Sequence, residues 1–530
     1  MAETMRDLLL AHAGSDRVGL AFEDRRWTWQ QVLSASAARA RVLRDLLEPE
    51  RPPHVGVLME NTPEMAMAIL AGALGAHVTV GINATRRGEA LAADVRRADC
   101  QLLLTDADHR RLLDGLDLGG IPVVEVDTDA WAAQVAEADG GLDGFPASAA
   151  DDLFMLIFTS GTSGDPKAVR LTHRMPVFAG EMLVDRFSLT AADVCYCSMP
   201  LFHSNAVAAC LAPAAAAGAT LALARRFSAS GFLADVRRYG ATYLSYVGKP
   251  LAYVLATPER PDDAVNPLRV AFGNEASDRD IAEFGRRFGC VVADGFGSTE
   301  NAVVVSRVPG TPPGSIGQPA PGVAVLDRET GAECPRAVVD GSGAVTNLDA
   351  CVGELVNTTG AGFFAGYYND DEATGERMRG GQYWSGDLAY RDEDGWVYLA
   401  GRTSDWLRVD GENLATAPIE RLLLRHEAIS QAAVYAVPDP LVGDQVMAAV
   451  VLRDSAKLSP DELERFLAGQ PDLSPKAWPR FVRIAAALPS TATNKVLKRE
   501  LAAEATATSD PVWVREERST SYDVMDAPLQ

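Results

Sequence analysis

One short segment of the chain carries the residue types that bind phosphate groups. From Met155 to Val169 it reads MLIFTSGTSGDPKAV, an apolar run followed by glycines, hydroxyls and one lysine. Glycines let consecutive backbone N–H groups point into one concavity, where hydroxyl side chains add donors and a lysine adds a cation. The residues that the segment offers for this purpose are Thr159, Ser160, Gly161, Thr162 and Lys167. A polyphosphate is the predicted ligand.

The segment is not the best-known type of nucleotide-binding loop, and it also has a purely structural interpretation. The Walker order G-x-x-x-x-G-K-[ST] is absent, so the segment is not a P-loop. A Gly- and Ser-rich surface loop between a strand and a helix is the plain structural interpretation. The remaining motifs of the chain decide between a surface loop and a phosphate site.

Further polar motifs follow in chain order. The segments MPLFHSNA, FGNEAS and DGFGSTEN place hydroxyl, amide or acidic groups after apolar runs. The segments YWSGDLAYRDEDGWVYLAGR and PSTATNKVLKREL add aspartate, arginine and lysine side chains. In open α/β sheets ligands collect at the carboxyl ends of the strands, so Gly-rich turns that follow strands are candidate ligand contacts.

In order and spacing, these motifs resemble those of the adenylate-forming superfamily, which comprises acyl-CoA synthetases, peptide-synthetase adenylation domains and luciferases. The likeness spans the chain apart from its tail. Local sequence segments such as DLFMLIFTSGTSGDPKAV and VDGENLATAPIE are most similar to those of bacterial fatty acid– and steroid side-chain–CoA ligases. The resemblance implies a reaction that consumes ATP, needs Mg²⁺ and uses CoA as the acceptor.

The resemblance also implies roles for single residues. Glu300 is the expected Mg²⁺ contact, since a hard oxygen ligand suits a hard ion. Lys495 would bridge the acid oxygen and the α-phosphate as a point charge, and His203 would gate the acyl pocket. Asp387 would accept hydrogen bonds from both ribose hydroxyls, with Arg402 as its basic partner. The predicted catalytic set is Lys495, His203, Thr162 and Glu300.

The resemblance also implies which residues of this sequence bind the nucleotide, the acid and CoA. The predicted nucleotide contacts are Thr159, Ser160, Gly161, Thr162, Lys167, Gly273, Asn274, Glu275, Asp294, Gly295, Phe296, Gly297, Ser298, Thr299, Asp387, Arg402 and Lys495. The predicted substrate pocket contains His203, Ser204, Asn205, Val247, Gly273 and Asn301. Gly411 would line the CoA tunnel after the C-terminal domain rotates about a hinge at residues 403–405.

Asn301 departs from the family pattern, because many fatty-acyl relatives have Gly or another small residue there. A polar amide beside a long alkyl chain is costly unless it finds a hydrogen-bond partner, so it would suit a small or polar acid. The leading predicted function is acyl-CoA synthesis, in which acid and ATP give acyl-AMP and pyrophosphate, and CoA then gives the thioester and AMP. The alternative is an ATP-dependent diazotase or amide-forming ligase, which activates a small oxyacid such as nitrite and transfers it to an aryl amine without CoA.

A third function, a non-catalytic binding or scaffolding relative, makes a different prediction. It predicts the loss of residues that the reaction needs. All five of the charged residues concerned are present, namely Lys167, Glu300, Asp387, Arg402 and Lys495. The sequence therefore favours an enzyme.

The elements that must hold these motifs indicate a layered α/β architecture. Apolar strands such as HVGVLM and CQLLLT alternate with helical patterns such as TPEMAMAILAGALGAH, which favours largely parallel sheets. A β-rich section follows Val323, and a small α+β unit follows Asp405. We predict an α/β protein with a large adenylation domain over 1–402, a hinge at 403–405, a small mobile α+β domain over 406–505 and a disordered tail over 506–530.

Size and charge limit the partners. A chain of 530 residues exceeds the ~250–300 residues of a single core, so two or more domains are expected. With 49 basic and 72 acidic residues the net charge is −23, which argues against nucleic acid or an anionic membrane as the main partner. Seven cysteines without a C-x-x-C pair and scattered histidines argue against zinc. We expect a cytoplasmic protein without a membrane span whose partners are a small acid, ATP and CoA, and a homodimer is left open.

Overall fold

The computed structural model describes residues 2–75, 77–159, 166–341, 345–402, 406–409, 412–439, 443–470, 473, 477–490, 496–516 and 519–525. The chain divides into two compact units, and each is described by itself. Unit 1 comprises Met1–Ala302 and Ala361–Met378, and unit 2 comprises Val303–Gly360 and Arg379–Gln530. The segment Ala361–Met378 therefore belongs to unit 1 although unit 2 residues flank it in the sequence.

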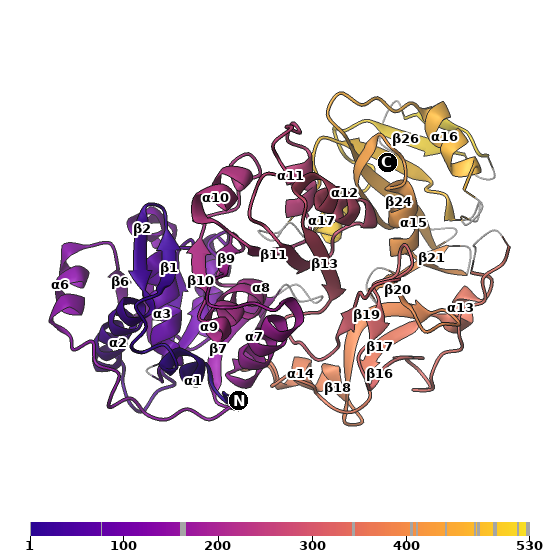
Figure 1. Ribbon diagram of the computed structural model, residues 1–530. Helices are drawn as coiled ribbons and strands as arrows, with labels where there is room; N and C mark the ends of the chain where they lie inside the picture. The colour runs from indigo at the N-terminus through magenta and orange to yellow at the C-terminus, as the bar shows by residue number, and fades with distance from the viewer. Residues whose placement is uncertain are drawn as a thin grey trace. The chain divides into compact units, whose positions relative to one another are not determined.

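The first sheet of unit 1 consists of parallel strands, apart from β8, which is antiparallel to β7. Figure 1 labels β6 and β7 of this sheet. Across the sheet the strands are β6 (Val123–Glu125), β5 (Leu102–Thr105), β3 (His54–Leu58), β4 (Val78–Gly81), β7 (Leu153–Thr159) and β8 (Lys167–Thr172). Burial of β3, β4 and β5 on both faces matches their continuous apolar sequences.

The second sheet of unit 1 is also parallel, except that β2 pairs antiparallel with β1. Within this unit its strands are β13 (Val291–Phe296), β12 (Val270–Asn274), β11 (Tyr243–Val247), β9 (Val194–Cys197), β10 (Thr220–Leu223), β1 (Val18–Phe22) and β2 (Arg25–Thr28). One buried apolar cluster contains residues of both sheets, for example Phe154 and Cys195. The carboxyl ends of β11, β12 and β13 lie next to one another because these strands are parallel neighbours.

Helices pack around these sheets, and their ends follow ordinary capping rules. The helix over Pro63–Ala73 begins where the Thr62 side chain accepts a hydrogen bond from the Met65 N–H, with proline at the first helical position. The helices of unit 1 are α1 (Met5–Leu10), α2 (Trp29–Leu46), α3 (Pro63–Ala73), α4 (Gly88–Arg97), α5 (Ala107–Arg110), η1 (Arg111–Leu113), α6 (Asp129–Glu137), α7 (Arg174–Phe187), α8 (Ser204–Ala206), the π-helix η2 (Val207–Leu211), α9 (Ala212–Ala217), α10 (Phe232–Tyr239), α11 (Pro250–Leu255), α12 (Asp278–Phe288) and α14 (Asp371–Arg377).

Unit 2 contains the β-rich section and the C-terminal α+β part. The short strands β14 (Val305–Ser306) and β15 (Gln318–Pro319) pair with each other, and β18 (Met378–Arg379) spans the boundary between the units. The β-rich sheet has the antiparallel strands β16 (Val323–Leu326), β17 (Gly353–Asn357), β19 (Gln382–Arg391) and β20 (Val397–Arg402). The C-terminal sheet contains β22 (Glu412–Ala415), β21 (Trp406–Val409), β24 (Gly443–Leu452), β25 (Phe481–Ala485), β26 (Val512–Arg515) and β27 (Tyr522–Val524), with β23 (Ile429–Asp439) on β24. The helices of unit 2 are α13 (Leu348–Cys351), α15 (Thr416–Leu423), α16 (Pro460–Ala468) and α17 (Lys498–Glu504).

The last part of the chain differs from the predicted disordered tail over 506–530. β26 pairs with β25 and β27 pairs with β26, so this segment extends the C-terminal sheet. Trp513 and Tyr522 are buried, and the Tyr522 hydroxyl donates to the Pro479 carbonyl oxygen at 2.6 Å. The sequence did not reveal this order because the apolar residues of the tail are few and lack a regular period, while Val512, Trp513 and Tyr522 are buried.

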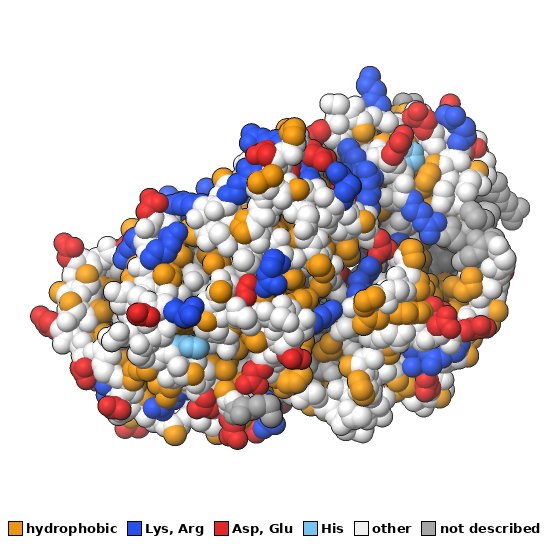
Figure 2. All heavy atoms as spheres, viewed as in Figure 1, with side chains coloured by type: hydrophobic (Ala, Val, Ile, Leu, Met, Phe, Trp, Pro, Cys, Tyr) orange, Lys and Arg blue, Asp and Glu red, His pale blue; other side chains and the backbone are white. Residues whose placement is uncertain are grey.

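The predicted α/β class, with a large N-terminal part and a smaller C-terminal part, is confirmed, whereas the predicted hinge at 403–405 lies outside the described residues. On the face in Figure 2, visible Lys and Arg side chains alternate with Asp and Glu side chains, so the net charge of −23 is not gathered into one patch there. None of the helices in the described part of the chain has the length and apolar character that a membrane crossing requires.

Candidate active site

The loop predicted to bind phosphate begins and ends on the hairpin of β7 and β8. β7 ends at Thr159 and β8 begins at Lys167, and these two residues pair directly across the antiparallel strands. Ser160, Gly161 and Thr162 lie outside the described residues. Two of the predicted phosphate contacts, Thr159 and Lys167, therefore face each other at the base of the loop.

The ammonium of Lys167 lies between an aromatic ring and a carboxylate. Its Nζ is 5.3 Å from the centroid of the Tyr367 ring and 3.7 Å from Glu376 Oε2. The Lys167 side chain is 13% exposed, whereas that of Glu376 is 65% exposed. Ion pairs open to water stabilise little, while a cation over a buried ring is screened less. The buried Tyr367 ring is therefore expected to stabilise the Lys167 ammonium more than the exposed Glu376 carboxylate does.

Glu300 receives a hydrogen bond from a residue that the sequence motifs do not predict. The Tyr367 hydroxyl donates to Glu300 Oε1 at 2.8 Å, and Tyr367 is only 3% exposed. Burial raises the pKa of Tyr367, the Glu300 carboxylate raises it further and Arg377 opposes the rise, so the phenol keeps its proton. No local pattern reveals this contact, because Glu300 and Tyr367 are 67 positions apart in the sequence.

Backbone hydrogen bonds attach the segment that carries Tyr367 to β8. Tyr367 forms an isolated antiparallel bridge with Val169. The Arg170 N–H donates to the Gly366 carbonyl at 3.1 Å, and the Tyr368 N–H donates to the Ala168 carbonyl at 2.8 Å. The segment thus lies along the strand that begins with Lys167.

The predicted adenine wall consists of the neighbouring strands β12 and β13. Gly273 pairs with Asp294 across these strands. A Cβ at Gly273 would overlap the Tyr246 carbonyl oxygen of β11, so the close approach of the strands requires glycine there. The Asn274 amide donates to the Gly297 carbonyl oxygen at 3.5 Å, which links the ends of both strands. The wall is therefore formed by strand ends whose packing leaves little freedom.

Asp294 is engaged inside the protein. Its Oδ2 accepts hydrogen bonds from the Tyr246 hydroxyl at 2.8 Å and from the Ala276 N–H at 3.2 Å. Asp294 is 5% exposed, so it ties β13 to β11 and to the start of the turn before α12. Within that turn Glu275 has φ 68°, a left-handed conformation that is uncommon for glutamate. Nucleotide contacts through Asp294 and Glu275 stay predictions.

The predicted acyl-pocket residues gather where α8 begins. His203 occupies the N-cap of α8, and its buried Nε2 has no partner among the described residues. Burial lowers the pKa of His203 to about 4, so the imidazole is neutral at neutral pH. The Asn205 amide donates to the Tyr246 carbonyl at 3.3 Å, next to Val247 at the end of β11. The fold thus brings His203 and Asn205 to the strand end that the sequence assigned to the acid.

Two hydroxyls connect the same helix start to the turn after β13. Ser204 Oγ lies 3.1 Å from Thr299 Oγ1. Thr299 directly precedes Glu300, so the hydrogen bond joins the predicted acyl pocket to the predicted Mg²⁺ contact. The structure therefore brings together residues that two separate motifs supplied.

The backbone conformation at position 301 explains why asparagine occurs there. Its φ is 47°, in the left-handed region, and its N–H donates to the Ser298 carbonyl oxygen at 3.1 Å. Glycine adopts this conformation without steric cost, and asparagine tolerates it better than other residues do. Asn301 and the glycine of the family pattern therefore satisfy the same backbone requirement.

In unit 2 the two residues predicted to hold the ribose lie directly opposite each other. Asp387 on β19 pairs with Arg402 on β20. Asp387 is 7% exposed, and its N–H donates to Ser385 Oγ at 3.1 Å. The side chain of Arg402, together with Gly411 and Lys495, lies outside the described residues, so their roles stay predictions.

Two family models match this chain. The model of the AMP-binding enzyme family matches residues 10–368, well over half of the chain. The chain belongs to the AMP-binding enzyme family. The model of the AMP-binding enzyme C-terminal domain matches residues 418–495, within unit 2. The predicted membership of the adenylate-forming superfamily is confirmed.

Individual relatives agree with this membership. The chain is 54% identical over 510 residues to a medium/long-chain-fatty-acid–CoA ligase of Mycobacterium tuberculosis, covering 96% of this chain and 98% of the relative. It is 46% identical over 520 residues to the steroid-22-oyl-CoA synthetase of Rhodococcus jostii, covering 96% and 93%. The crystal structure of ATP-bound MatB from Rhodopseudomonas palustris superposes with a TM-score of 0.82 at 23% identity, covering 95% of this chain and 99% of that chain, which shows a common fold.

The residues of this AMP-binding enzyme fit a nucleotide-bound Mg²⁺ rather than a dedicated metal cage. Among the described residues no group of three or more His, Cys, Asp or Glu side chains could hold a metal ion. Mg²⁺ commonly takes one or two carboxylates and fills its other positions with phosphate oxygens and water. Glu300, whose Oε1 already accepts from Tyr367, is the carboxylate that the sequence predicts for this role.

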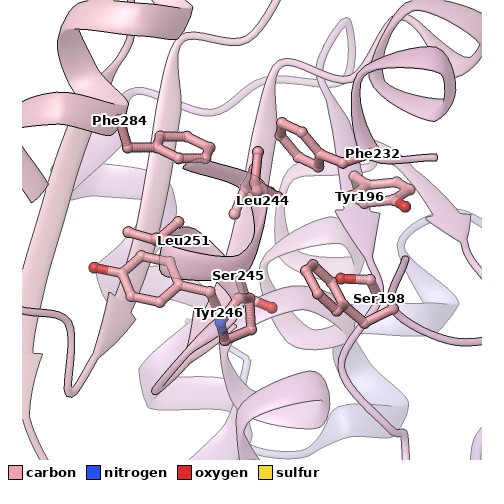
Figure 3. A pocket seen from close by; sticks show the side chains of 11 residues that line it. Tyr196, Ser198, Phe232, Leu244, Ser245, Tyr246, Leu251 and Phe284 are labelled. Carbon is pink, nitrogen blue, oxygen red and sulfur yellow. The ribbon is translucent and has the colours of Figure 1, made fainter. Parts of the chain in front are cut away.

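A small cavity of this AMP-binding enzyme lies elsewhere in the core. It is about 10 Å³, room for one water molecule at most. Figure 3 shows Tyr196 of β9, Phe232 of α10, Leu244 of β11 and Phe284 of α12 around it. None of the predicted substrate residues lines this cavity. It is a packing space between the sheet and its helices, and we assign it no ligand.

Proposed function

We propose that this protein is an AMP-forming acyl-CoA ligase that activates a carboxylic acid with ATP and transfers the acyl group to CoA. The observation that carries the proposal is the 54% identity to a fatty-acid–CoA ligase over nearly the full length of both chains. At this identity and coverage the reaction class is shared, and the predicted class of acid–thiol ligase is confirmed.

The reaction has two steps. In the first, a carboxylate oxygen attacks the α-phosphorus of ATP, and the bond to pyrophosphate breaks. In the second, the CoA sulfur attacks the carbonyl carbon of the acyl-adenylate, and AMP leaves. Negative charge grows on the phosphate oxygens in the first step, so fixed cations and donors must lie there beforehand.

The charges that the first step needs are assigned to named residues. Lys167 binds the pyrophosphate portion of ATP, and Asp387 binds the ribose hydroxyls. Lys495 bridges the acid and the α-phosphate. Mg²⁺, when bound at Glu300, neutralises charge on the phosphates and orients them. The position of Lys167 beside a buried ring, and the burial of Asp387, support these assignments.

The acid is proposed to be a medium- or long-chain fatty acid or a steroid side-chain acid. These are the acids in the names of the relatives with 54% and 46% identity. The alternative of nitrite activation depended on the polarity of Asn301, and the backbone conformation at φ 47° accounts for that residue without a polar substrate. The relatives named for CoA ligation favour CoA as the acceptor. A homodimer and a cytoplasmic location stay predictions.

The test is pyrophosphate release from Mg²⁺·ATP with octanoate, palmitate, a steroid side-chain acid and nitrite, each with and without CoA and with an aryl amine. Mass spectrometry identifies the products. We expect an acyl-CoA and AMP with one of the carboxylic acids, and no thioester when CoA is omitted. Turnover of nitrite with the amine, indifferent to CoA, would overturn the proposal.

A further inference from the structure

One buried tyrosine contacts two predicted ATP-site residues at once. The Tyr367 hydroxyl donates to Glu300 Oε1 at 2.8 Å, while Lys167 Nζ lies over its ring, 5.3 Å from the centroid. Glu300 follows β13 in the second sheet and Lys167 begins β8 in the first sheet. Tyr367 is therefore the described side chain that links the predicted metal contact to the predicted phosphate contact.

We propose that Tyr367 is a positioning residue of the nucleotide site, which orients the Glu300 carboxylate for Mg²⁺ and holds the Lys167 ammonium for phosphate. This inference rests on the proposed function, which gives Glu300 and Lys167 those ligands. A hydrogen bond to one carboxylate oxygen restricts the rotation of the group and leaves the other oxygen available to a metal ion. Partners of this kind orient metal ligands and, when removed, typically weaken metal affinity by roughly 10–100-fold.

The tyrosine itself is held from several sides. Thr374 Oγ1 accepts from the Tyr367 N–H at 2.9 Å and donates to the Asp370 carbonyl at 2.9 Å. Asp370 caps α14, so the start of that helix fixes the backbone that carries the ring. The Phe364 ring packs edge-on against Tyr367 at 5.0 Å between centroids. A side chain that is 3% exposed and held in this way can orient its neighbours without large loss of entropy.

The same segment offers Lys167 an anion that competes with phosphate only weakly. Glu376 belongs to α14, and its Oε2 lies 3.7 Å from Lys167 Nζ, but its side chain is 65% exposed. An exposed pair at this distance contributes little. An incoming phosphate can replace this carboxylate, whereas the Tyr367 ring stays under the ammonium.

The first test separates the hydroxyl from the ring. Tyr367→Phe removes the hydrogen bond to Glu300 and keeps the ring beside Lys167. We expect this variant to weaken binding of α,β-methylene-ATP about 10-fold in Mg²⁺, measured by calorimetry, and to leave binding in EDTA unchanged. The matched control is Tyr368→Phe, since the Tyr368 hydroxyl donates to a different carboxylate, Asp99, at 3.0 Å. The control should bind like wild type in both buffers.

Further variants test whether Tyr367 affects nucleotide binding through Glu300 and through its contact with Lys167. Tyr367→Leu removes the ring as well and should weaken binding in EDTA by about 3-fold, as expected for loss of a cation–π contact. Glu300→Gln should remove the Mg²⁺ dependence, and Tyr367→Phe added to it should have no further effect. Thr374→Val should act in the same direction as Tyr367→Phe, while Thr374→Ser should restore wild-type binding.

The outcomes are distinguishable from failure of the proposed function, because nucleotide binding needs neither the acid nor CoA. Wild-type protein that binds no nucleotide in Mg²⁺ would overturn the proposed function and this inference together. Wild-type binding that Tyr367→Phe leaves unchanged in Mg²⁺ would overturn the inference alone. An equal loss in Mg²⁺ and EDTA, or a further loss in the Glu300→Gln background, would also overturn it, because Tyr367 would then act on the fold and not through Glu300.

Discussion

At Asn301 the backbone, and not the side chain, accounts for the residue type. The φ of 47° lies in a region where an ordinary L-residue is strained, and the turn from Ser298 to Asn301 includes the predicted Mg²⁺ contact Glu300. Asparagine relieves this strain by local hydrogen bonding, and glycine avoids it altogether. At the residue scale, the conformation of the turn limits which residues this position accepts.

Two substitutions at Asn301 test this account. Asn301→Gly should keep the free energy of unfolding within a few tenths of a kcal/mol, whereas Asn301→Ala should lower it by about 1 kcal/mol. Urea unfolding followed by circular dichroism measures both. Equal stability of the two variants would contradict the backbone explanation, and a change of acid preference in Asn301→Gly would instead assign the side chain to the substrate pocket.

At the scale of elements, the C-terminal sheet depends on its last two strands. β26 pairs with β25, and β27 continues the sheet beyond β26. Trp513 is 6% exposed in the cluster that also contains Leu407, Val434 and Trp478. The last strands therefore cover apolar surface of the domain that the family model assigns to the C-terminal part of these enzymes.

Trp513→Ala should destabilise this sheet strongly. Loss of a buried tryptophan typically costs about 3–5 kcal/mol, because it removes apolar burial and leaves a cavity. Differential scanning calorimetry should show a lower temperature for the transition of the C-terminal sheet. The matched control is Val524→Ala, because Val524 pairs with Trp513 across the strands but is 60% exposed. A disordered tail would make the two variants alike.

At the scale of the whole molecule, unit 1 contains several histidines buried in its core. Burial lowers the pKa values of His77, His173 and His203 to about 4. His173 Nδ1 accepts the Met5 N–H at 3.3 Å, which requires that nitrogen to be unprotonated. Unfolded histidine titrates near pH 6.5, so between pH 6.5 and 4 the unfolded chain binds more protons than the folded chain does. The stability that these neutral histidines contribute to unit 1 is therefore lost progressively as the pH falls through that window.

His173→Asn isolates one of these contributions, because asparagine keeps an acceptor near Nδ1 but does not titrate. The stability of wild type relative to this variant should fall by about 3 kcal/mol in total between pH 7.5 and pH 4, starting below pH 6.5. Urea unfolding at several pH values measures the difference. A difference that does not change with pH would show that His173 titrates normally in the folded protein.

The motifs predicted to contact ATP could be read from the sequence, since each is a short run of residues in a fixed order. The paired positions of Thr159 and Lys167, the parallel strands before FGNEAS and DGFGSTEN, and the opposition of Asp387 and Arg402 all agree with that order. Short motifs suffice to identify these residues, whereas their pairing across strands is a property of the sheets.

The sequence by itself determined the family, the α/β class and the reaction. Each motif of the family is a short contiguous run of residues, so it can be recognised without the tertiary structure. Only the tertiary structure placed Tyr367 against Glu300 and Lys167, since that contact depends on a distant segment returning to unit 1. It also decided that the tail forms strands and that Asn301 occupies a left-handed turn. The physical reason is the same throughout: burial, strand register and backbone dihedral angles are fixed by packing between segments that the sequence keeps far apart.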